Sequence, residues 1–128
     1  MSLKVILLAL ALTCMVCVAF FAWKRPRSGT LEFLYKIVTP EEWKKAQEEG
    51  YVPRGVIDTD FIHLSTEEQL DRILAKFWKD KSAVILKLET SELEGDLRFE
   101  TNPGGSTKFY HLYDGKIPTS CVKNSSEK

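Results

Sequence analysis

The hydrophobic pattern divides the chain into two unequal parts. Residues 5–23 (VILLALALTCMVCVAFFAW) carry no charge, and Lys24, Arg25 and Arg27 follow at once. Because an α-helix rises about 1.5 Å per residue, roughly 20 apolar residues cross the hydrocarbon core of a bilayer. The pattern predicts a short tip over residues 1–4, a transmembrane helix over 5–23 and a polar linker over 24–30.

A cleaved signal peptide is the alternative for the same segment. Cys17, Val18 and Ala19 offer a small-x-small cleavage pattern, but the apolar run exceeds the roughly 7 to 15 residues usual in signal peptides. Basic residues beside a span tend to remain cytoplasmic, and more of them follow the run than precede it. We therefore expect a single-pass membrane localisation, with the folded domain facing the cytoplasm.

Two helices are expected early in the remaining chain. Thr39 and Glu42 form a capping box, and Gly50 suits the left-handed conformation that ends a helix. Ser65 and Glu68 form a second box, followed by apolar residues at helical spacing that are expected to enter the core. These apolar residues are Leu70, Ile73, Leu74, Phe77 and Trp78.

Runs rich in β-branched and aromatic residues predict the strands. They lie at 31–38, 61–64, 83–88, 96–100, 108–113 and 117–122. Asp114 and Gly115 between the last two are a typical hairpin signal. The fold class expected is α+β, a single compact domain of mixed strands with two early helices over residues 31–122, followed by a disordered tail over 123–128.

The charge balance narrows the classes of partner. From Leu31 onward the chain has 14 basic and 18 acidic residues, a net charge of −4. Nucleic-acid phosphates are normally met by clustered Lys and Arg, so no nucleic-acid partner is expected. Cys121 is the one cysteine of this part, which excludes a disulfide within the domain.

The two histidines of the chain occupy the same local pattern. Alternate residues of a strand share a face, so each histidine lies between an aromatic and a hydroxyl side chain. The two sets are Phe61, His63 and Ser65, and Phe109, His111 and Tyr113. The first set ends at a strand-to-helix junction, where unpaired N–H groups favour an anion. The pattern indicates a substrate-binding pocket formed by His63, Ser65, His111 and Tyr113, or two structural histidines.

The sequence gives less support to a metal site or to a cysteine nucleophile. A zinc site needs further ligands at a recognisable spacing, and the two histidines have no third ligand of that kind, so no metal is predicted. Cys121 has no neighbouring cation or helix N-terminus that would stabilise a thiolate nucleophile.

Four segments together resemble a known family. They read YKIVTPEEWKKAQEEGYV, DFIHLSTEEQL, LRFE and FYHLYDGKIP, in this order and spacing. Through these segments, the chain from Leu31 to Val122 resembles the bacterial and plant "domain of unknown function 952" family. That resemblance implies a compact α+β domain without an established activity, and an ADP-ribosyltransferase-like fold.

The resemblance also implies a ligand. Relatives of that wider fold bind NAD or its ADP-ribose, and in some of them a histidine and a Ser or Thr at a strand end hold a ribose. The matching residues are His63 and Ser65, and Glu100 is the candidate catalytic carboxylate late in the sheet. Asp60 and Tyr110 depart from the glycine and proline common in the family.

Two functions remain open from the sequence. The first is a membrane-anchored domain that binds NAD or an ADP-ribose-like nucleotide, with NAD as a possible substrate rather than a resident cofactor. The second is a non-catalytic membrane-tethered binding or protein-interaction module, in which Tyr51, Phe61 or Tyr110 closes the pocket over the histidines.

Overall fold

The computed structural model describes residues 30–128. The predicted tip and transmembrane helix, and the linker except Thr30, lie outside the described residues. Two α-helices and seven strands are present in the described part, with three short 3₁₀ helices (η1, Glu67–Gln69; η2, Thr90–Glu92; η3, Thr119–Cys121). In chain order the main elements are β1 (Phe33–Val38), α2 (Pro40–Glu49), β2 (Tyr51–Val52), β3 (Ile62–Leu64), α3 (Leu70–Phe77), β4 (Val84–Glu89), β5 (Glu94–Thr101), β6 (Lys108–Pro118) and β7 (Val122–Glu127).

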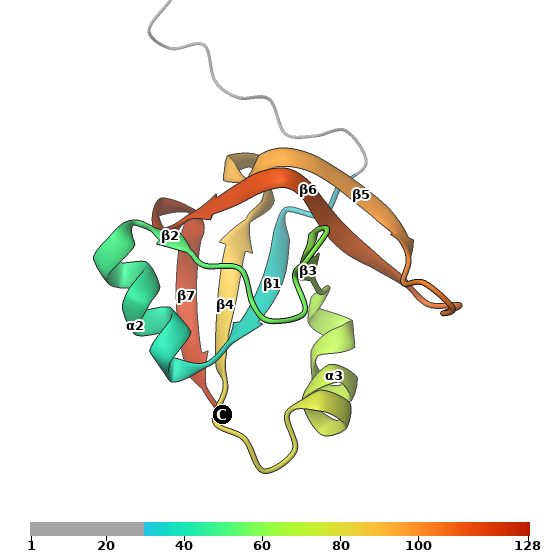
Figure 1. The fold of residues 1–128 in the computed structure, drawn as a ribbon, viewed down its shortest axis with the longest axis horizontal. Coiled ribbons are helices and arrows are strands. Elements are labelled where there is room, and N and C mark those ends of the chain that lie inside the picture. Colours follow the sequence, from blue (N-terminus) through green and yellow to red (C-terminus); the bar gives the residue numbers. More distant parts are fainter. Residues whose placement is uncertain (1–29) are drawn as a thin grey trace, which may run out of the picture.

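The strands form two sheets (Figure 1). One has the order β1-β4-β7, and in the other the long strand β6 pairs with β2, β3 and β5. A single bridge between Tyr35 and Ser65 joins the start of the first sheet to the end of β3. Each strand pair within residues 30–128 is antiparallel, so the expected mixed arrangement of strands is corrected while the α+β class with two helices holds.

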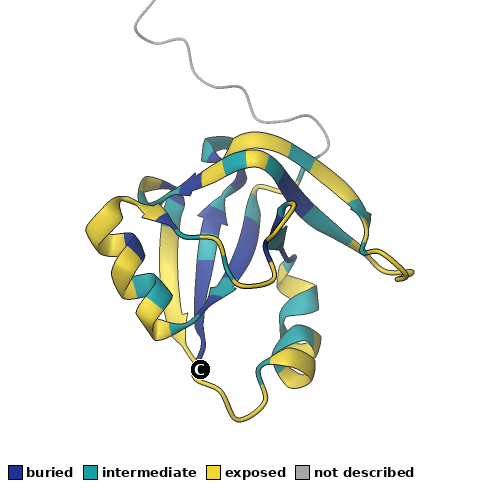
Figure 2. Cartoon of the chain, viewed as in Figure 1, coloured by how far each residue is buried: buried dark blue, intermediate teal, exposed yellow. Residues whose placement is uncertain are grey.

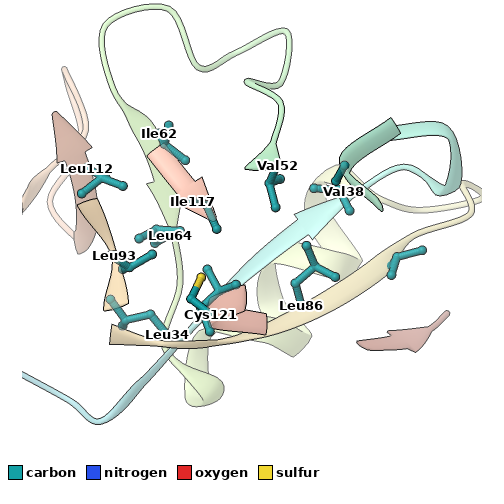
Figure 3. Close-up of a cluster of buried hydrophobic side chains, with 13 residues drawn as sticks. Leu34, Val38, Val52, Ile62, Leu64, Leu86, Leu93, Leu112, Ile117 and Cys121 are labelled. Carbon is teal, nitrogen blue, oxygen red and sulfur yellow. The ribbon is translucent and has the colours of Figure 1, made fainter. Parts of the chain in front are cut away.

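The core lies between the two sheets (Figure 3). The first sheet contributes alternate apolar side chains of β1 and β4, and the second contributes those of β3 and β6. They include Leu34, Val38, Leu86, Leu88, Ile62, Leu64, Leu112 and Ile117, all buried. Burial of this apolar surface is the main stabilising contribution to the fold.

The first predicted helix is confirmed in its capping. The Glu42 N–H donates to Thr39 Oγ1 at 3.0 Å, and Glu42 Oε1 accepts the Thr39 N–H at 2.9 Å. Gly50 ends the helix with a φ of 86°, and its N–H reaches the Ala46 carbonyl. The helix therefore ends where only a residue without a Cβ adopts the backbone at little cost.

The second helix differs from its prediction. Thr66 rather than Ser65 precedes it, with the Thr66 N–H bonded to Gln69, and η1 forms its first turn. No residue of α3 is fully buried, and the helix is coloured intermediate and exposed in Figure 2. Phe77 keeps 59% of its surface exposed. The apolar stripe of the helix is half-covered rather than part of the core, because α3 follows the end of β3 at the rim of the sheets (Figure 1).

The predicted hairpin at Asp114 and Gly115 is wrong. β6 runs through both residues, and the hairpin turn lies at 102–107, between β5 and β6. Opposite Gly115 the register of β5 shifts at Gly95, whose φ is 124°. A Cβ on Gly115 would lie 2.1 Å from the Glu94 carbonyl oxygen, so the glycine allows two backbones to approach at a bulge instead of making a turn.

The polar tail is ordered by backbone pairing. Residues 123–128 were expected to be disordered because their side chains are hydrophilic, yet most of them form β7 against β4, from Leu88 opposite Val122 to Val84 opposite Glu127. The Lys128 N–H also bonds to the Ala83 carbonyl at 2.9 Å. An edge strand with exposed side chains is held by its ladder hydrogen bonds, which hydropathy does not report.

The membrane prediction finds no spanning helix in the part of the chain that the structure describes. Among residues 30–128 no helix is long and apolar enough to cross a membrane. The 10 residues of α2 and the 8 of α3 correspond to about 15 and 12 Å of helix, against a hydrocarbon core of about 30 Å. The fold class that included a transmembrane helix, and the single-pass membrane localisation with a cytoplasmic-facing domain, are corrected to this extent: residues 30–128 contain no such helix, and residues 5–23 lie outside the described part.

Replacing Leu88 with alanine should lower the free energy of unfolding by about 2 to 5 kcal/mol, because the side chain is fully buried and its removal leaves a cavity. Denaturant unfolding of the full chain measures this. The matched control is Leu74→Ala on the half-covered face of α3, which should cost about 1 kcal/mol. Equal losses would show that α3 belongs to the core.

Replacing Gly115 with alanine should destabilise the domain by about 1 to 3 kcal/mol, because the new Cβ would overlap the Glu94 backbone. Gly105→Ala is the control. A Cβ there meets its nearest atom, the Asn102 carbonyl oxygen, at 3.3 Å, and the unfolding free energy should change by no more than about 0.5 kcal/mol. A tolerated Gly115→Ala would mean that the bulge is not required.

Candidate functional site

The structure brings the two histidines together. His63 on β3 lies directly opposite His111 on β6, and their ring centroids are 5.5 Å apart. Phe61 packs against both rings, with its centroid 4.7 Å from that of His63 and stacked 3.8 Å from that of His111. Side chains that face each other across an antiparallel pair share one side of the sheet. The neighbouring residues Ile62 and Leu64 point to the core, so the histidines occupy the opposite face.

His63 is oriented by a buried carboxylate. Its Nδ1 lies 2.8 Å from Oδ1 of Asp58, and its backbone N–H donates to the same oxygen at 3.0 Å. A carboxylate only accepts hydrogen bonds, so Nδ1 carries the proton. The imidazole is 29% exposed, and its Nε2 has no hydrogen-bond partner within residues 30–128. A neutral His63 therefore presents an acceptor nitrogen to the surface.

Asp58 is held as an anion inside the protein. Its Oδ2 is 2.7 Å from Nζ of Lys36 on β1 and accepts the Gly55 N–H at 2.8 Å. Burial alone would raise the pKa of Asp58, but the hydrogen bonds from His63 and the charge and hydrogen bond of Lys36 outweigh it and hold the pKa well below its usual range. The carboxylate thus stays ionised at neutral pH.

His111 is enclosed rather than presented. The residue is fully buried, with Nδ1 2.9 Å from Oε1 of Glu100 and Nε2 2.8 Å from Oδ1 of Asn102. The oxygen and nitrogen of an amide exchange places by a half-turn, so Asn102 can supply the donor that a neutral His111 needs at Nε2. With both nitrogens engaged and Phe61 over the ring, His111 organises the site but does not face a ligand.

Glu100 and Tyr113 complete the cluster on the far side of His111. The Tyr113 hydroxyl donates a short hydrogen bond to Oε1 of Glu100, the same oxygen that faces His111. The bonds from Tyr113 and then His111 lower the pKa of Glu100, and the carboxylate in turn raises the pKa of Tyr113. The Glu100 side chain is 35% exposed, and its second oxygen has no hydrogen-bond partner among the described residues.

A cation lies at the edge of this group. Arg98 on β5 is directly opposite His111 and lies over the Tyr113 ring, with 4.0 Å from Cζ to the ring centroid. Its Nε donates to Oδ2 of Asp96 at 2.8 Å. These contacts fix the guanidinium over the aromatic ring.

Ser65 is the predicted site residue that does not join the cluster of the histidines. It is buried, and its backbone N–H and carbonyl pair with Tyr35 at 2.9 and 2.8 Å. Within residues 30–128 its hydroxyl makes no hydrogen bond to the histidines. His63, His111, Tyr113 and Glu100 therefore form one cluster, while Ser65 connects the two sheets.

The sequence reasoning missed the residues beneath the histidines. Asp58 lies in a loop five residues before His63, and nothing in the surrounding sequence marks it as buried. Lys36 did carry a signal, because a lone lysine among the apolar residues of a buried strand needs an ionic partner. Asn102 lies in the β5–β6 turn, where polar residues are ordinary.

The described residues give little support to a metal site or to a cysteine nucleophile. Histidine, cysteine and acidic side chains of residues 30–128 form no group of three or more that could hold a metal ion. Burial raises the pKa of the Cys121 thiol to about 12, so it is not a thiolate at neutral pH. The arrangement instead offers one acceptor nitrogen, one partly exposed carboxylate and one cation.

Comparisons with known proteins agree with this fold. The sequence resembles the protein CC0527 from Caulobacter crescentus, whose crystal structure is 33% identical with a TM-score of 0.65 and matches 74% of this chain and 84% of CC0527. Its solution NMR structure gives 33% identity, a TM-score of 0.64 and coverages of 75% and 84%. No curated protein matches the chain significantly.

The likeness shows that this chain shares the fold of CC0527, a compact α+β domain. The expected ADP-ribosyltransferase-like fold class is corrected to this coarser description. Residues 37–125 match the family described as "Protein of unknown function (DUF952)". This match covers more than half of the chain and includes every residue of the cluster except Lys36. The chain therefore belongs to the DUF952 family.

Proposed function

We propose that the domain binds a ribose-containing nucleotide of the NAD or ADP-ribose type, and that Nε2 of His63 accepts a hydrogen bond from a ribose hydroxyl. The observation that carries this proposal is the pair formed by Asp58 and His63. A buried carboxylate that fixes the tautomer of a partly exposed imidazole prepares Nε2 as an acceptor or general base. A histidine with a purely structural role would need no such orientation at its exposed nitrogen.

Glu100 supplies a second acceptor for the same ligand. Its Oε1 is occupied by His111 and Tyr113, and Oε2 of this partly exposed side chain remains for a hydroxyl. Two acceptors on one face, on either side of His111, suit a ligand that carries several hydroxyls, as a nucleotide does. If the domain transfers an ADP-ribosyl group, Glu100 is the carboxylate that would polarise a ribose hydroxyl, and NAD would be the substrate.

A second function is favoured by one contact. Phe61 stacks on His111 at 3.8 Å and covers it, which is the closure expected of a non-catalytic binding or protein-interaction module. In that case the ligand would reach only the outer rim of the cluster. The two functions differ in whether His63 is needed for a small molecule to bind.

Calorimetric titration of the full chain with NAD, ADP-ribose and nicotinamide riboside tests the proposal, with the histidine ring signals followed by NMR. His63→Ala should weaken binding about tenfold, because one hydrogen bond to an oriented acceptor is lost. The melting temperature should fall less than in a variant of the fully buried His111, because Asp58 loses the ring of His63 but keeps Lys36, the Gly55 N–H and the backbone N–H of residue 63.

His111→Gln serves as the comparison for this experiment. His111 is fully buried and bonded on both sides, so its replacement should lower the melting temperature. Absence of binding by the wild-type chain, or equal binding by His63→Ala, would overturn the nucleotide proposal and leave the protein-interaction module.

The ionised state of Asp58 predicts a dependence of stability on pH. The carboxyl has an ordinary pKa near 3.9 in the unfolded chain and a lower pKa in the folded one, so its contribution is fully present above about pH 4 and is lost as the pH falls below that value. In the double variant Lys36→Met with Asp58→Asn, the free energy of unfolding should decline less between about pH 5 and pH 2.

The double variant is needed because Asp58→Asn alone leaves Lys36 buried without its counter-charge, a change that costs about 3 to 5 kcal/mol. Asp60→Asn is the matched control. Asp60 is exposed, and this variant should keep the wild-type slope. A double variant with the same slope as the wild type would mean that Asp58 is not the buried anion described above.

A further inference from the structure

We infer that Arg98 forms an anion-binding subsite beside His63, so that the preferred ligand is a ribose that carries a phosphate. This inference rests on the proposed function and narrows its ligand class. None of the residues predicted from the sequence included a cation, although a nucleotide brings at least one phosphate to the site.

The sheet places Arg98 in line with both histidines. His63 on β3, His111 on β6 and Arg98 on β5 are directly opposite one another in register. Neighbouring strands lie about 4.8 Å apart, so the backbones of His63 and Arg98 are separated by roughly 10 Å. Residues opposite each other share a face, so a ligand on this face meets His63 at one end and Arg98 at the other. That separation fits a sugar phosphate rather than a single functional group.

The guanidinium is prepared for an anion by its own contacts. Asp96 engages only Nε, and the Tyr113 ring supports the plane of the group at 4.0 Å. The two terminal nitrogens have no hydrogen-bond partner within residues 30–128, and the side chain is 51% exposed. A planar guanidinium with two unoccupied N–H groups binds phosphate oxygens in pairs, and its fixed orientation reduces the entropy lost on binding.

The charges around the cluster give Arg98 a decisive position. Lys36 is buried and neutralises Asp58, so it does not reach a ligand. Glu100 and Asp60 both add negative potential near Tyr113. A phosphate would be repelled by these carboxylates unless a cation faced it. Arg54 is also exposed, but its guanidinium is engaged by the Asp58 and Thr59 carbonyls, whereas both terminal nitrogens of Arg98 lack a partner among the described residues. The preference of the site for a phosphate therefore depends mainly on Arg98.

A matched pair of ligands tests the inference. Nicotinamide mononucleotide and nicotinamide riboside differ by one phosphate, and the ratio of their dissociation constants isolates its contribution. By calorimetry at low salt, the wild-type full chain should bind the mononucleotide about 10 to 100 times more tightly. In Arg98→Met this ratio should fall to about one or below, while the affinity for the riboside stays within about twofold.

Two further variants separate charge from geometry. Arg98→Lys should keep part of the preference, because a lysine retains the charge but not the paired donors. Arg72→Met removes an exposed arginine from α3 and should leave the ratio unchanged. Thermal unfolding of each variant checks that Arg98→Met remains folded, as expected for a side chain that is half exposed.

The possible failures are distinguishable. If the wild-type chain binds neither ligand, the proposed function fails and the subsite with it. If it binds both equally, prefers the riboside, or keeps its preference for the mononucleotide in Arg98→Met, the nucleotide proposal stands and the Arg98 subsite is overturned.

Discussion

The candidate site depends on one buried charge. A carboxylate removed from water is costly unless it is paired and hydrogen-bonded, and Asp58 receives Lys36 from β1, the Gly55 N–H from its own loop and both the backbone and the ring of His63. The charge therefore ties the loop before β3 and the strand β3 itself to β1, whose Lys36 lies 22 residues away in sequence. Arg54 adds a bond from its guanidinium to the Asp58 carbonyl, which closes the same loop. The orientation of His63 is thus fixed by the fold as a whole and not by its own strand.

Features that depend on interactions between residues close in the sequence could be predicted, and features that depend on distant residues could not. The cap of α2 and the shared face of the two histidines depend on residues a few positions apart, and both could be predicted from spacing. The pairing of strands that are far apart in the sequence could not be predicted from spacing. Asp114 and Gly115 suit a turn but lie in β6, because Gly95 approaches them from β5, and β7 is ordered by the backbone of β4 although its side chains are polar.

The residues of the candidate site could also be predicted only in part. Glu100 was expected as a carboxylate near the histidines, and it lies beside His111 and Tyr113. Asp58 was not expected, since a loop aspartate becomes part of a site only when distant groups neutralise it. The apolar stripe of α3 predicts a helix correctly, but the prediction that its side chains enter the core is wrong, because spacing does not say how closely a stripe is covered. Its half-exposed state follows from the position of the helix at the rim of the sheets.

The two histidines share a sequence pattern and differ in what surrounds them. His111 is the middle residue of the row, with a strand on each side, so Phe61, Glu100 and Asn102 can enclose it completely. His63 lies on the short strand β3, where only one nitrogen is engaged. An enclosed imidazole fixes the positions of Glu100 and Phe61, and a half-open one offers Nε2. Chemistry at this cluster is therefore confined to its rim, where His63, the free oxygen of Glu100 and Arg98 surround a centre that is already filled by protein.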